Sequence, residues 1–125
     1  MMIEVSNGEI LDKFSILKIK LANITDYEKI KNVEKEIEII EPIFDSICKD
    51  LKIKDLFEML LGVNKKLWKI EDDIREHERN KNFDEEFIQL ARNVYITNDI
   101  RATIKKEINL LSNSNIIEEK SYERY

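Results

Sequence analysis

Apolar residues recur at steps of three and four along most of the chain, which is the spacing of side chains on one face of an α-helix. The first such stripe runs through Ile10, Phe14, Leu17, Leu21 and Ile24, and further stripes follow it. The pattern predicts four helices, at about 7–24, 26–50, 55–79 and 84–111.

Polar residues at the expected helix starts support this division. Residues 6–9 and 25–28 have the spacing of capping boxes, in which two side chains satisfy free backbone amides reciprocally. Asp55 and Asp84 are expected to cap the third and fourth helices. Pro42 has no N–H to donate and would clash with the preceding turn, so we predict that the second helix is broken there.

The connections between the predicted helices are short, and short connections make neighbouring helices antiparallel. We therefore expect an all-α fold, an antiparallel up-down bundle of four main helices in one domain over 1–125. Ile3–Val5 is predicted to form a short extended arm before the bundle. The polar stretch 112–115 should end the last helix, and the charged tail 113–125 is expected either to fray or to dock on the bundle.

Composition narrows the classes of protein that fit. The 125 residues are 42% hydrophobic and 38% charged, and they include two Gly and one Pro. So few glycines cannot supply the turns of a β-sandwich, a Rossmann loop or a P-loop. The apolar runs are far shorter than the ~20 residues of a membrane span, and no signal peptide is visible. The one cysteine, Cys48, cannot form an internal disulfide, so we expect a cytoplasmic protein without membrane contact.

The charges are numerous but mixed. The formal net charge is −5, and acidic and basic residues alternate without a basic stripe, which disfavours nucleic-acid binding. The single histidine, His77, excludes a multi-histidine metal site. Two groups of carboxylates are expected to share a helical face, namely Glu9 with Asp12 and the acidic residues at 71–73. All-helical Mg²⁺-dependent nucleotide pyrophosphohydrolases have carboxylates arranged in this way. Such spacings arise by chance in so acidic a chain, so we predict no metal site and no cofactor.

Some polar residues lie where the helical pattern calls for apolar ones. Arg101 falls on the stripe of the fourth helix between Val94 and Ile108, with Asn98 one turn earlier. A charge that faces a core is stable only when it is paired or solvated. The candidate ligand-binding residues that share this property, on or beside the seams, are Glu9, Asp12, Lys13, Asn64, Glu71, Arg75, Asn98 and Arg101.

Two interpretations of this set stay open. In the first, the residues form a paired ionic layer and ordinary solvated helix faces. In the second, they line one polar cleft between the first, third and fourth helices, where Arg101, Arg75 and a lysine bind an anion. Glu71, Glu78 or Asp12 would then orient that anion or hold a cation.

Several phrases of the sequence resemble a small uncharacterised family of bacterial and phage proteins. Residues 4–20 read EVSNGEILDKFSILKIK, similar to the family phrase EVSxGELxDKxTILxIK. Residues 67–75 read LWKIEDDIR and 98–109 read NDIRATIKKEIN, similar to LWxIEDxIR and NDxRAxIKxEIN. The family is a domain of unknown function. The resemblance implies a link to sugar transfer or surface-polysaccharide metabolism, and its phrases include the candidate residues named above.

Two classes of function follow from these observations. The first is a binding or assembly module that forms a homodimer and takes a protein partner or a small anionic ligand such as a sugar phosphate. The alternative is a small enzyme with an Arg/Lys/Glu cleft. It would resemble chorismate mutase or, with Mg²⁺, a nucleotide pyrophosphohydrolase. The sequence does not identify a reaction or a catalytic residue.

Overall fold

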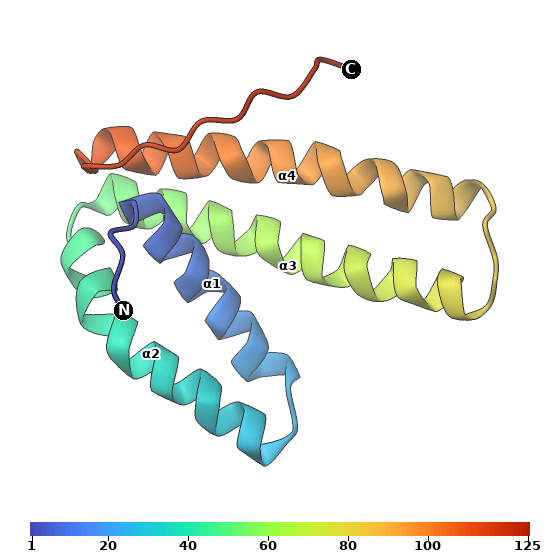
Figure 1. Cartoon of the computed structure of the whole chain (residues 1–125), viewed down its shortest axis with the longest axis horizontal. Helices are drawn as coiled ribbons and strands as arrows, with labels where there is room; N and C mark the ends of the chain where they lie inside the picture. The colour runs from blue at the N-terminus through green and yellow to red at the C-terminus, as the bar shows by residue number, and fades with distance from the viewer.

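Four helices joined by short turns make up most of the computed structural model, which describes residues 1–125 (Figure 1). In chain order they are α1 (Asn7–Asn23), α2 (Tyr27–Ile47), α3 (Leu51–Arg79) and α4 (Glu85–Leu111). Successive helices alternate in direction, so the predicted all-α up-down fold is confirmed. None of the four combines the length and the apolar character needed to cross a membrane.

Side-chain caps begin all four helices. The Ser6 hydroxyl accepts a hydrogen bond from the Glu9 amide at 3.1 Å, and Asp84 caps α4 in the same way, as predicted. The cap of α2 is Asp26, the second residue of the predicted capping box. The start predicted for the third helix at Asp55 is wrong, because Asp50 caps α3 and the added turn brings Ile53 into the core.

The predicted break at Pro42 is also wrong, since α2 continues through this residue as one helix. A proline inside a helix removes one backbone hydrogen bond and crowds the preceding turn. In α2 the buried residues Ile40 and Phe44 lie on either side of Pro42 along the chain. Burial of both side chains holds the helix together across the proline, whose own side chain is exposed.

The core lies where α1 is packed against the other three helices. Phe14 of α1, Phe44 of α2 and Phe57 of α3 form an aromatic cluster at its centre. The rings of Phe14 and Phe44 stack with centroids 4.2 Å apart, and Phe57 meets Phe44 edge-on at 4.6 Å. Leu11 and Leu17 extend this core along α1 toward Ile104 and Ile108 of α4.

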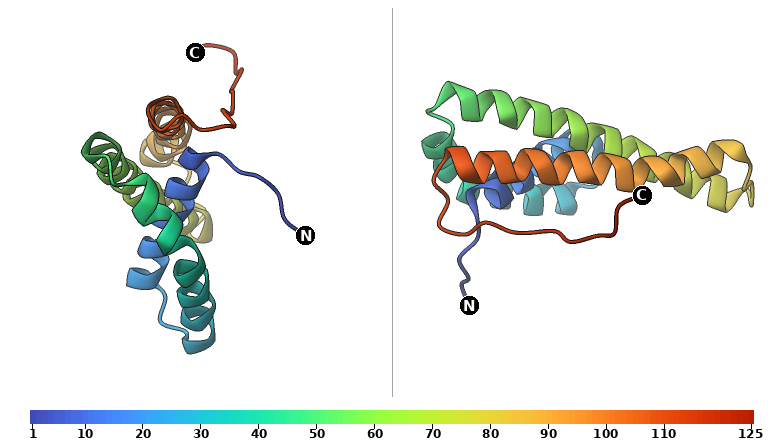
Figure 2. Two further views of the ribbon diagram at one scale, coloured as in Figure 1. Left: turned by 90° about the vertical axis from the view of Figure 1, so that its left-hand side faces the viewer. Right: turned by 90° about the horizontal axis from the view of Figure 1, so that it is seen from above.

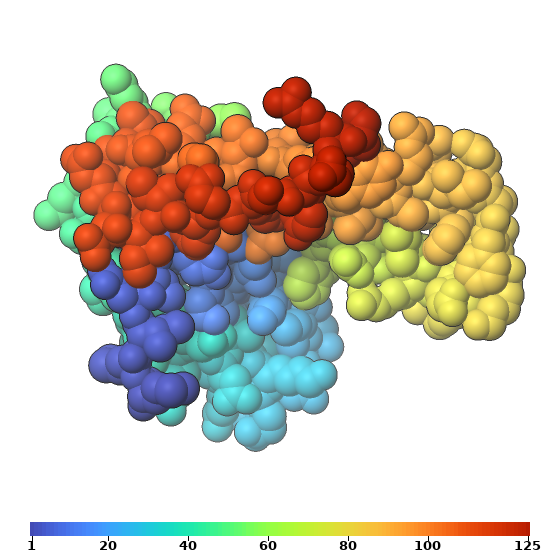
Figure 3. Space-filling model, turned by 45° about the horizontal axis from the view of Figure 1, so that its top comes forward, coloured from blue at the N-terminus to red at the C-terminus, as the bar shows by residue number.

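The two hairpins do not run in parallel along their whole length. Figure 1 shows α3 and α4 side by side, with α1 and α2 inclined to them and diverging toward the α1/α2 turn. The far end of the α3/α4 hairpin extends beyond the α1/α2 pair, and the space-filling view in Figure 3 shows it protruding from the body of the molecule. Residues of the C-terminal half of α1, such as Ile19 and Ala22, border a groove together with Leu61 and Trp68 of α3.

Residues 112–125 follow α4 without regular secondary structure and return along it, as two views in Figure 2 show. Lys106 of α4 binds Glu119 of this tail at 2.8 Å, and Asn109 donates to Glu118 at 3.2 Å. Of the two predicted states of the tail, the structure therefore shows the docked one. The N-terminal segment up to Val5 is exposed and has no regular structure, consistent with the predicted arm.

Candidate functional site

A buried carboxylate on α1 lies at the centre of the polar residues that interrupt the core. Asp12 is 1% exposed, and its Oδ1 accepts hydrogen bonds from Arg101 Nε at 2.9 Å and Asn64 Nδ2 at 2.8 Å. The Arg101 Nη2 group binds its second oxygen, so the guanidinium makes a two-pronged contact. The three side chains come from α1, α3 and α4, and they tie these helices together.

Ser15 belongs to the same network, although it was absent from the predicted site. Asn64 Nδ2 donates to the Ser15 hydroxyl at 2.7 Å, and that hydroxyl donates to the backbone carbonyl of Asp12 at 2.7 Å. The sequence feature that could have identified Ser15 is its position on the core-facing side of α1, beside Phe14 and one turn after Leu11. A buried serine there needs a partner, and Asn64 supplies it.

Both charged partners of the buried contact are held in their ionised forms. Burial alone would raise the pKa of Asp12, but hydrogen bonds from Arg101 and Asn64 and the charges of Arg101 and Lys105 keep it below its ordinary value. The hydrogen bond with Asp12 raises the pKa of Arg101 further, against the effect of burial. Neither group therefore changes charge near neutral pH.

A second ion pair covers this contact on the side of the α1 start. Lys105 Nζ lies 2.8 Å from Glu9 and 3.7 Å from Asp12. The Glu9 carboxylate therefore binds Lys105 across the helix interface, and only the Ser6 half of the predicted capping box is formed. The four charges of Glu9, Asp12, Arg101 and Lys105 balance one another. This part of the set matches the paired ionic layer.

The remaining candidates lie around a cleft between α1, α3 and α4. Its volume is about 390 Å³, and Ile16 and Ile19 of α1 form one side of it. Five of the eight predicted residues line it: Asn64, Glu71, Arg75, Asn98 and Arg101. The structure thus brings together residues from positions 64 to 101 of the chain in one place, as the second interpretation expected.

Polar groups in the cleft retain free hydrogen-bonding capacity. Arg101 Nη1 has only a long contact with Asn98, at 3.4 Å, and the Arg101 side chain is 28% exposed. Arg75 pairs with Glu71 at 2.6 Å on the exposed side of α3. Exposed pairs of this i,i+4 kind contribute only about 0.3–0.5 kcal/mol, so a ligand can displace Glu71 from Arg75 at little cost.

Trp68 forms part of the wall of this cleft together with Leu67. The indole is half-buried and also borders a groove on the other side of α1, beside Lys18 and Lys65. An aromatic residue on a helix seam usually belongs to the core, so periodicity alone does not place Trp68 in a binding site. In the structure it offers an apolar surface next to the polar groups of Arg75 and Arg101.

Lys13 does not belong to this site. Its ammonium group lies 3.4 Å from Glu36 of α2, on an exposed face of α1. One step along a helix turns a side chain by about 100°, so the residue after buried Asp12 points toward a different neighbour. The prediction that Lys13 shares a site with Asp12 is therefore wrong. Glu9 and Asp12 themselves lie beneath the cleft and do not line it.

The carboxylates do not converge on a common point. No group of three or more His, Cys, Asp or Glu side chains is placed so that it could hold a metal ion. His77 lies near the α3/α4 turn, where its Nδ1 is 3.0 Å from the carbonyl oxygen of Asn82. Cys48 is buried, which raises the pKa of its thiol to about 11 and makes it a poor nucleophile.

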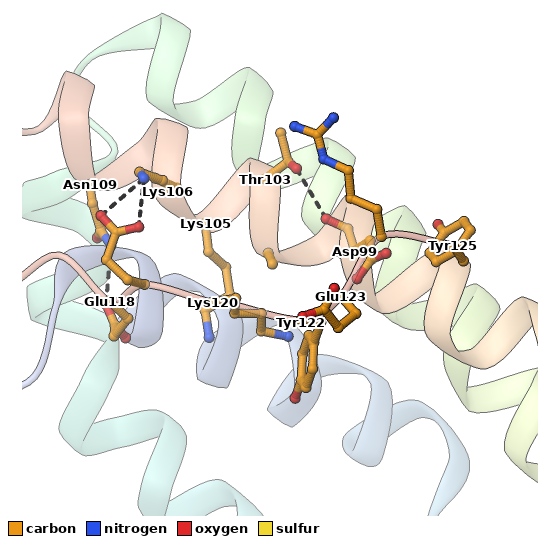
Figure 4. A pocket seen from close by; sticks show the side chains of 13 residues that line it. Asp99, Thr103, Lys105, Lys106, Asn109, Glu118, Lys120, Tyr122, Glu123 and Tyr125 are labelled. Atoms are coloured by element: carbon orange, nitrogen blue, oxygen red, sulfur yellow. Dashed lines mark hydrogen bonds and ion pairs between the residues drawn. The ribbon is translucent and has the colours of Figure 1, made fainter.

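A second hollow, of about 530 Å³, lies between α4 and the returning tail (Figure 4). One ion pair joins its two sides, between Lys106 of α4 and Glu119 of the tail at 2.8 Å. Burial would raise the pKa of Glu118, but hydrogen bonds from Ser6, its own backbone and Asn109 and the charge of Lys105 hold it below the ordinary value. None of the eight predicted residues lines this hollow, which results from the docking of the tail.

Comparison with known proteins gives one match. A family model described as a family of unknown function, DUF6165, matches residues 1–125. No curated protein and no solved structure matches the chain.

Proposed function

Because the chain belongs to the family of unknown function DUF6165, its function has to be argued from its own side chains, and we propose that it is a small-ligand binding module. The cleft between α1, α3 and α4 is the proposed site, and its ligand is a sugar phosphate or a similar small polar ring with one acidic group. The observation that carries this proposal is the gathering of Arg75, Arg101 and Trp68 around one cleft.

The carboxylates that line the cleft limit its ligand to a mostly neutral molecule with no more than one anionic group. Arg101 is neutralised by Asp12, and the carboxylates of Glu71 and Asp72 also line the cleft. Planar amides, carboxylates and guanidinium groups can bind adjacent hydroxyls of a sugar ring. The acidic group of the ligand would replace Glu71 as the partner of Arg75, which makes a bidentate contact with phosphate possible.

Trp68 supports a ring-shaped ligand. A half-buried indole beside polar groups supplies apolar contact area at low cost in conformational entropy. The apolar face of a sugar ring fits such a surface while its hydroxyls reach Asn64 and Asn98. Sugar-phosphate binding also agrees with the link to sugar metabolism that the resemblance implied.

Binding is favoured over catalysis. The two cleft-region groups with displaced pKa values, Asp12 and Arg101, are both displaced toward their charged forms. A general acid or base near neutral pH needs the opposite displacement. General acid–base catalysis therefore gains no support from these two groups, whereas their permanent charges suit the binding of a ligand. The buried free thiol of Cys48 supports the cytoplasm as the proposed compartment.

Titration calorimetry with glucose 1-phosphate, glucose and inorganic phosphate tests the proposal. We expect the sugar phosphate to bind more tightly than either of its parts. Arg75→Ala should weaken its binding at least tenfold, since only an exposed ion pair is lost from the fold. Arg79→Ala is the matched control, one turn further along α3 and outside the cleft, and should change affinity less than twofold.

Three results would contradict the proposal. Absence of binding of all three compounds at millimolar concentration would reject the cleft as a site of this class. Equal losses in Arg75→Ala and Arg79→Ala would place the ligand elsewhere. Inorganic phosphate binding as tightly as the sugar phosphate would reject the role of Trp68 and leave only an anion site.

A further inference from the structure

Beyond the body of the molecule, α3 and α4 continue as a two-helix arm formed by residues 67–97, which Figures 1 and 3 show projecting past α1 and α2. Between Lys65 and Ile96 only Ile70 is buried. The other apolar residues of the arm seam are half-buried, namely Leu67, Trp68, Ile74, Phe87, Leu90 and Val94. Two helices alone cannot cover both sides of a shared seam. The tail covers the arm only at its base, where Tyr125 packs against Tyr95 with ring centroids 5.2 Å apart, so most of the arm lacks a partner.

The body of the molecule shows what such a partner does. Where α1 lies against α3 and α4, Leu60, Ile104 and Ile108 are nearly fully buried. α1 no longer covers the seam between α3 and α4 where it diverges from them, but the apolar positions of α3 and α4 continue beyond that point into the arm. A further pair of helices on the arm would therefore extend the four-helix packing to its tip.

Charge is distributed unevenly along the same arm. The tip, residues 76–86, contains five Asp or Glu residues and two Lys or Arg residues. At the base, a groove of about 600 Å³ between α1 and α3 is lined by three lysines and two aspartates, with Ile19, Leu61 and Trp68 among its apolar residues. Of the lysines, Lys69 pairs with Asp73 at 3.1 Å, whereas Lys18 and Lys65 form no ion pair, so the groove keeps a small positive charge. An acidic tip and a basic, partly apolar base on one arm complement each other when two arms run in opposite directions.

We infer that this surface binds a second copy of the chain, with the two arms packed antiparallel about a two-fold axis near Ile74. That arrangement places the acidic tip of each arm beside the basic groove at the base of the other, and it closes a four-helix bundle from two copies. The contact is self-complementary, so it forms a closed dimer and does not propagate. It requires no bound ligand, and it shares Leu67 and Trp68 with the edge of the proposed sugar-phosphate site.

Ala91 provides a sharp test of the interface. It is exposed on α4, one turn from both Phe87 and Val94, so an added side chain would stand on the open face without disturbing the monomer. Gln89, two residues earlier, is also exposed and lies on the opposite side of the same helix. Ala91→Arg and Gln89→Arg thus add the same group to the same helix, and only the first should block the second copy.

Sedimentation equilibrium of the full chain at micromolar concentrations gives the readout. We expect the unmodified protein to sediment as a dimer, Gln89→Arg to match it, and Ala91→Arg to dissociate at least tenfold more readily. Higher NaCl concentration should also weaken the dimer, because the tip and the groove carry opposite charges. Circular dichroism should be the same for both variants.

A monomer at all concentrations up to about 1 mM would overturn the inference, and so would equal dissociation of the two variants. A dimer that strengthens at high salt would reject the antiparallel pairing of tip and groove. Ala91 does not line the cleft, so Ala91→Arg should leave the binding of glucose 1-phosphate unchanged, and failure of the ligand proposal can be distinguished from failure of this one.

Discussion

The guanidinium of Arg101 on α4 contacts both carboxylate oxygens of Asp12, a residue of α1 that is 1% exposed. This contact joins positions 89 residues apart in the chain. The carboxylate has lost its water shell and depends on Arg101 and Asn64 for replacement of the lost hydrogen bonds. The contact therefore supports the fold and at the same time fixes Arg101 at the edge of the cleft.

Removal of Arg101 should destabilise the protein strongly. Arg101→Ala leaves the buried Asp12 charge without its main partner, and we expect a loss of about 3 kcal/mol in the free energy of unfolding. Arg92→Ala, at an exposed position of the same helix, should change it by less than about 0.5 kcal/mol. Urea denaturation measures both. Similar losses in the two variants would show that the Asp12 contact adds nothing to stability.

Acid should weaken the fold through the same carboxylate. The folded-state pKa of Asp12 lies below its ordinary value of 3.8. Its contribution to stability is therefore complete above that value and is lost as the pH falls through the folded-state pKa. Glu118, whose pKa is also lowered, acts with the same sign. We expect the free energy of unfolding to fall below about pH 4.

Asp12→Asn isolates the part of this dependence that belongs to Asp12. The amide keeps the shape of the side chain but does not titrate, so the variant should be less stable at pH 7 and lose less stability on acidification. Denaturation curves between pH 7 and pH 3 provide the comparison. Parallel pH profiles for the variant and the unmodified protein would rule out Asp12 as a source of the acid sensitivity.

The helices and part of the candidate site can be predicted from the sequence. The reasons why a prediction succeeds or fails differ from residue to residue. Ser6 and Asp84 were identified as caps because capping depends on residues within one turn. Asp50 was missed because Asp55 has the same local chemistry, and tertiary burial of Ile53 decides between them. Pro42 was misjudged for the same reason, since core packing of the neighbouring turns opposes the local preference for a break.

Periodicity identified Arg101 as a charge facing the core, but it could not name the partner. Asp12 and Asn64 reach it only after α1, α3 and α4 have packed together. Lys13 was grouped with Asp12 because a sequence pattern resolves helix faces only coarsely, whereas packing directs the two side chains to α2 and α4. The cleft itself follows from the angle at which α1 diverges, and no local pattern encodes that angle.

Thr97 is the one buried side chain whose polar atom has no hydrogen-bond partner. Its hydroxyl is 1% exposed in α4, so its desolvation is not compensated. Thr97→Val replaces the hydroxyl by a methyl group of similar size, and we expect a gain of up to about 1 kcal/mol in the free energy of unfolding. Thermal denaturation is adequate for this measurement. A clear loss of stability would mean that the hydroxyl has a partner, such as a bound water molecule.

The two glycines of the chain should respond in opposite ways to the same substitution. Gly8, in the first turn of α1, donates its amide to Asn109 at 2.6 Å, and a Cβ there would lie 2.6 Å from the backbone oxygen of Lys105. Gly62, inside α3, has no atom within 4 Å of the position that a Cβ would take. Gly8 is therefore required for close contact between two helices, whereas Gly62 only raises the conformational entropy of the unfolded chain.

Gly8→Ala should lower the free energy of unfolding by about 1–3 kcal/mol, because the backbone of α4 must move away from α1. Gly62→Ala should raise it by about 1 kcal/mol, the usual difference in helix propensity between the two residues. Urea denaturation of both variants under one set of conditions compares them directly, and neither glycine lines the cleft. If Gly8→Ala were as stable as Gly62→Ala, the start of α1 could not lie as close to α4 as the structure places it.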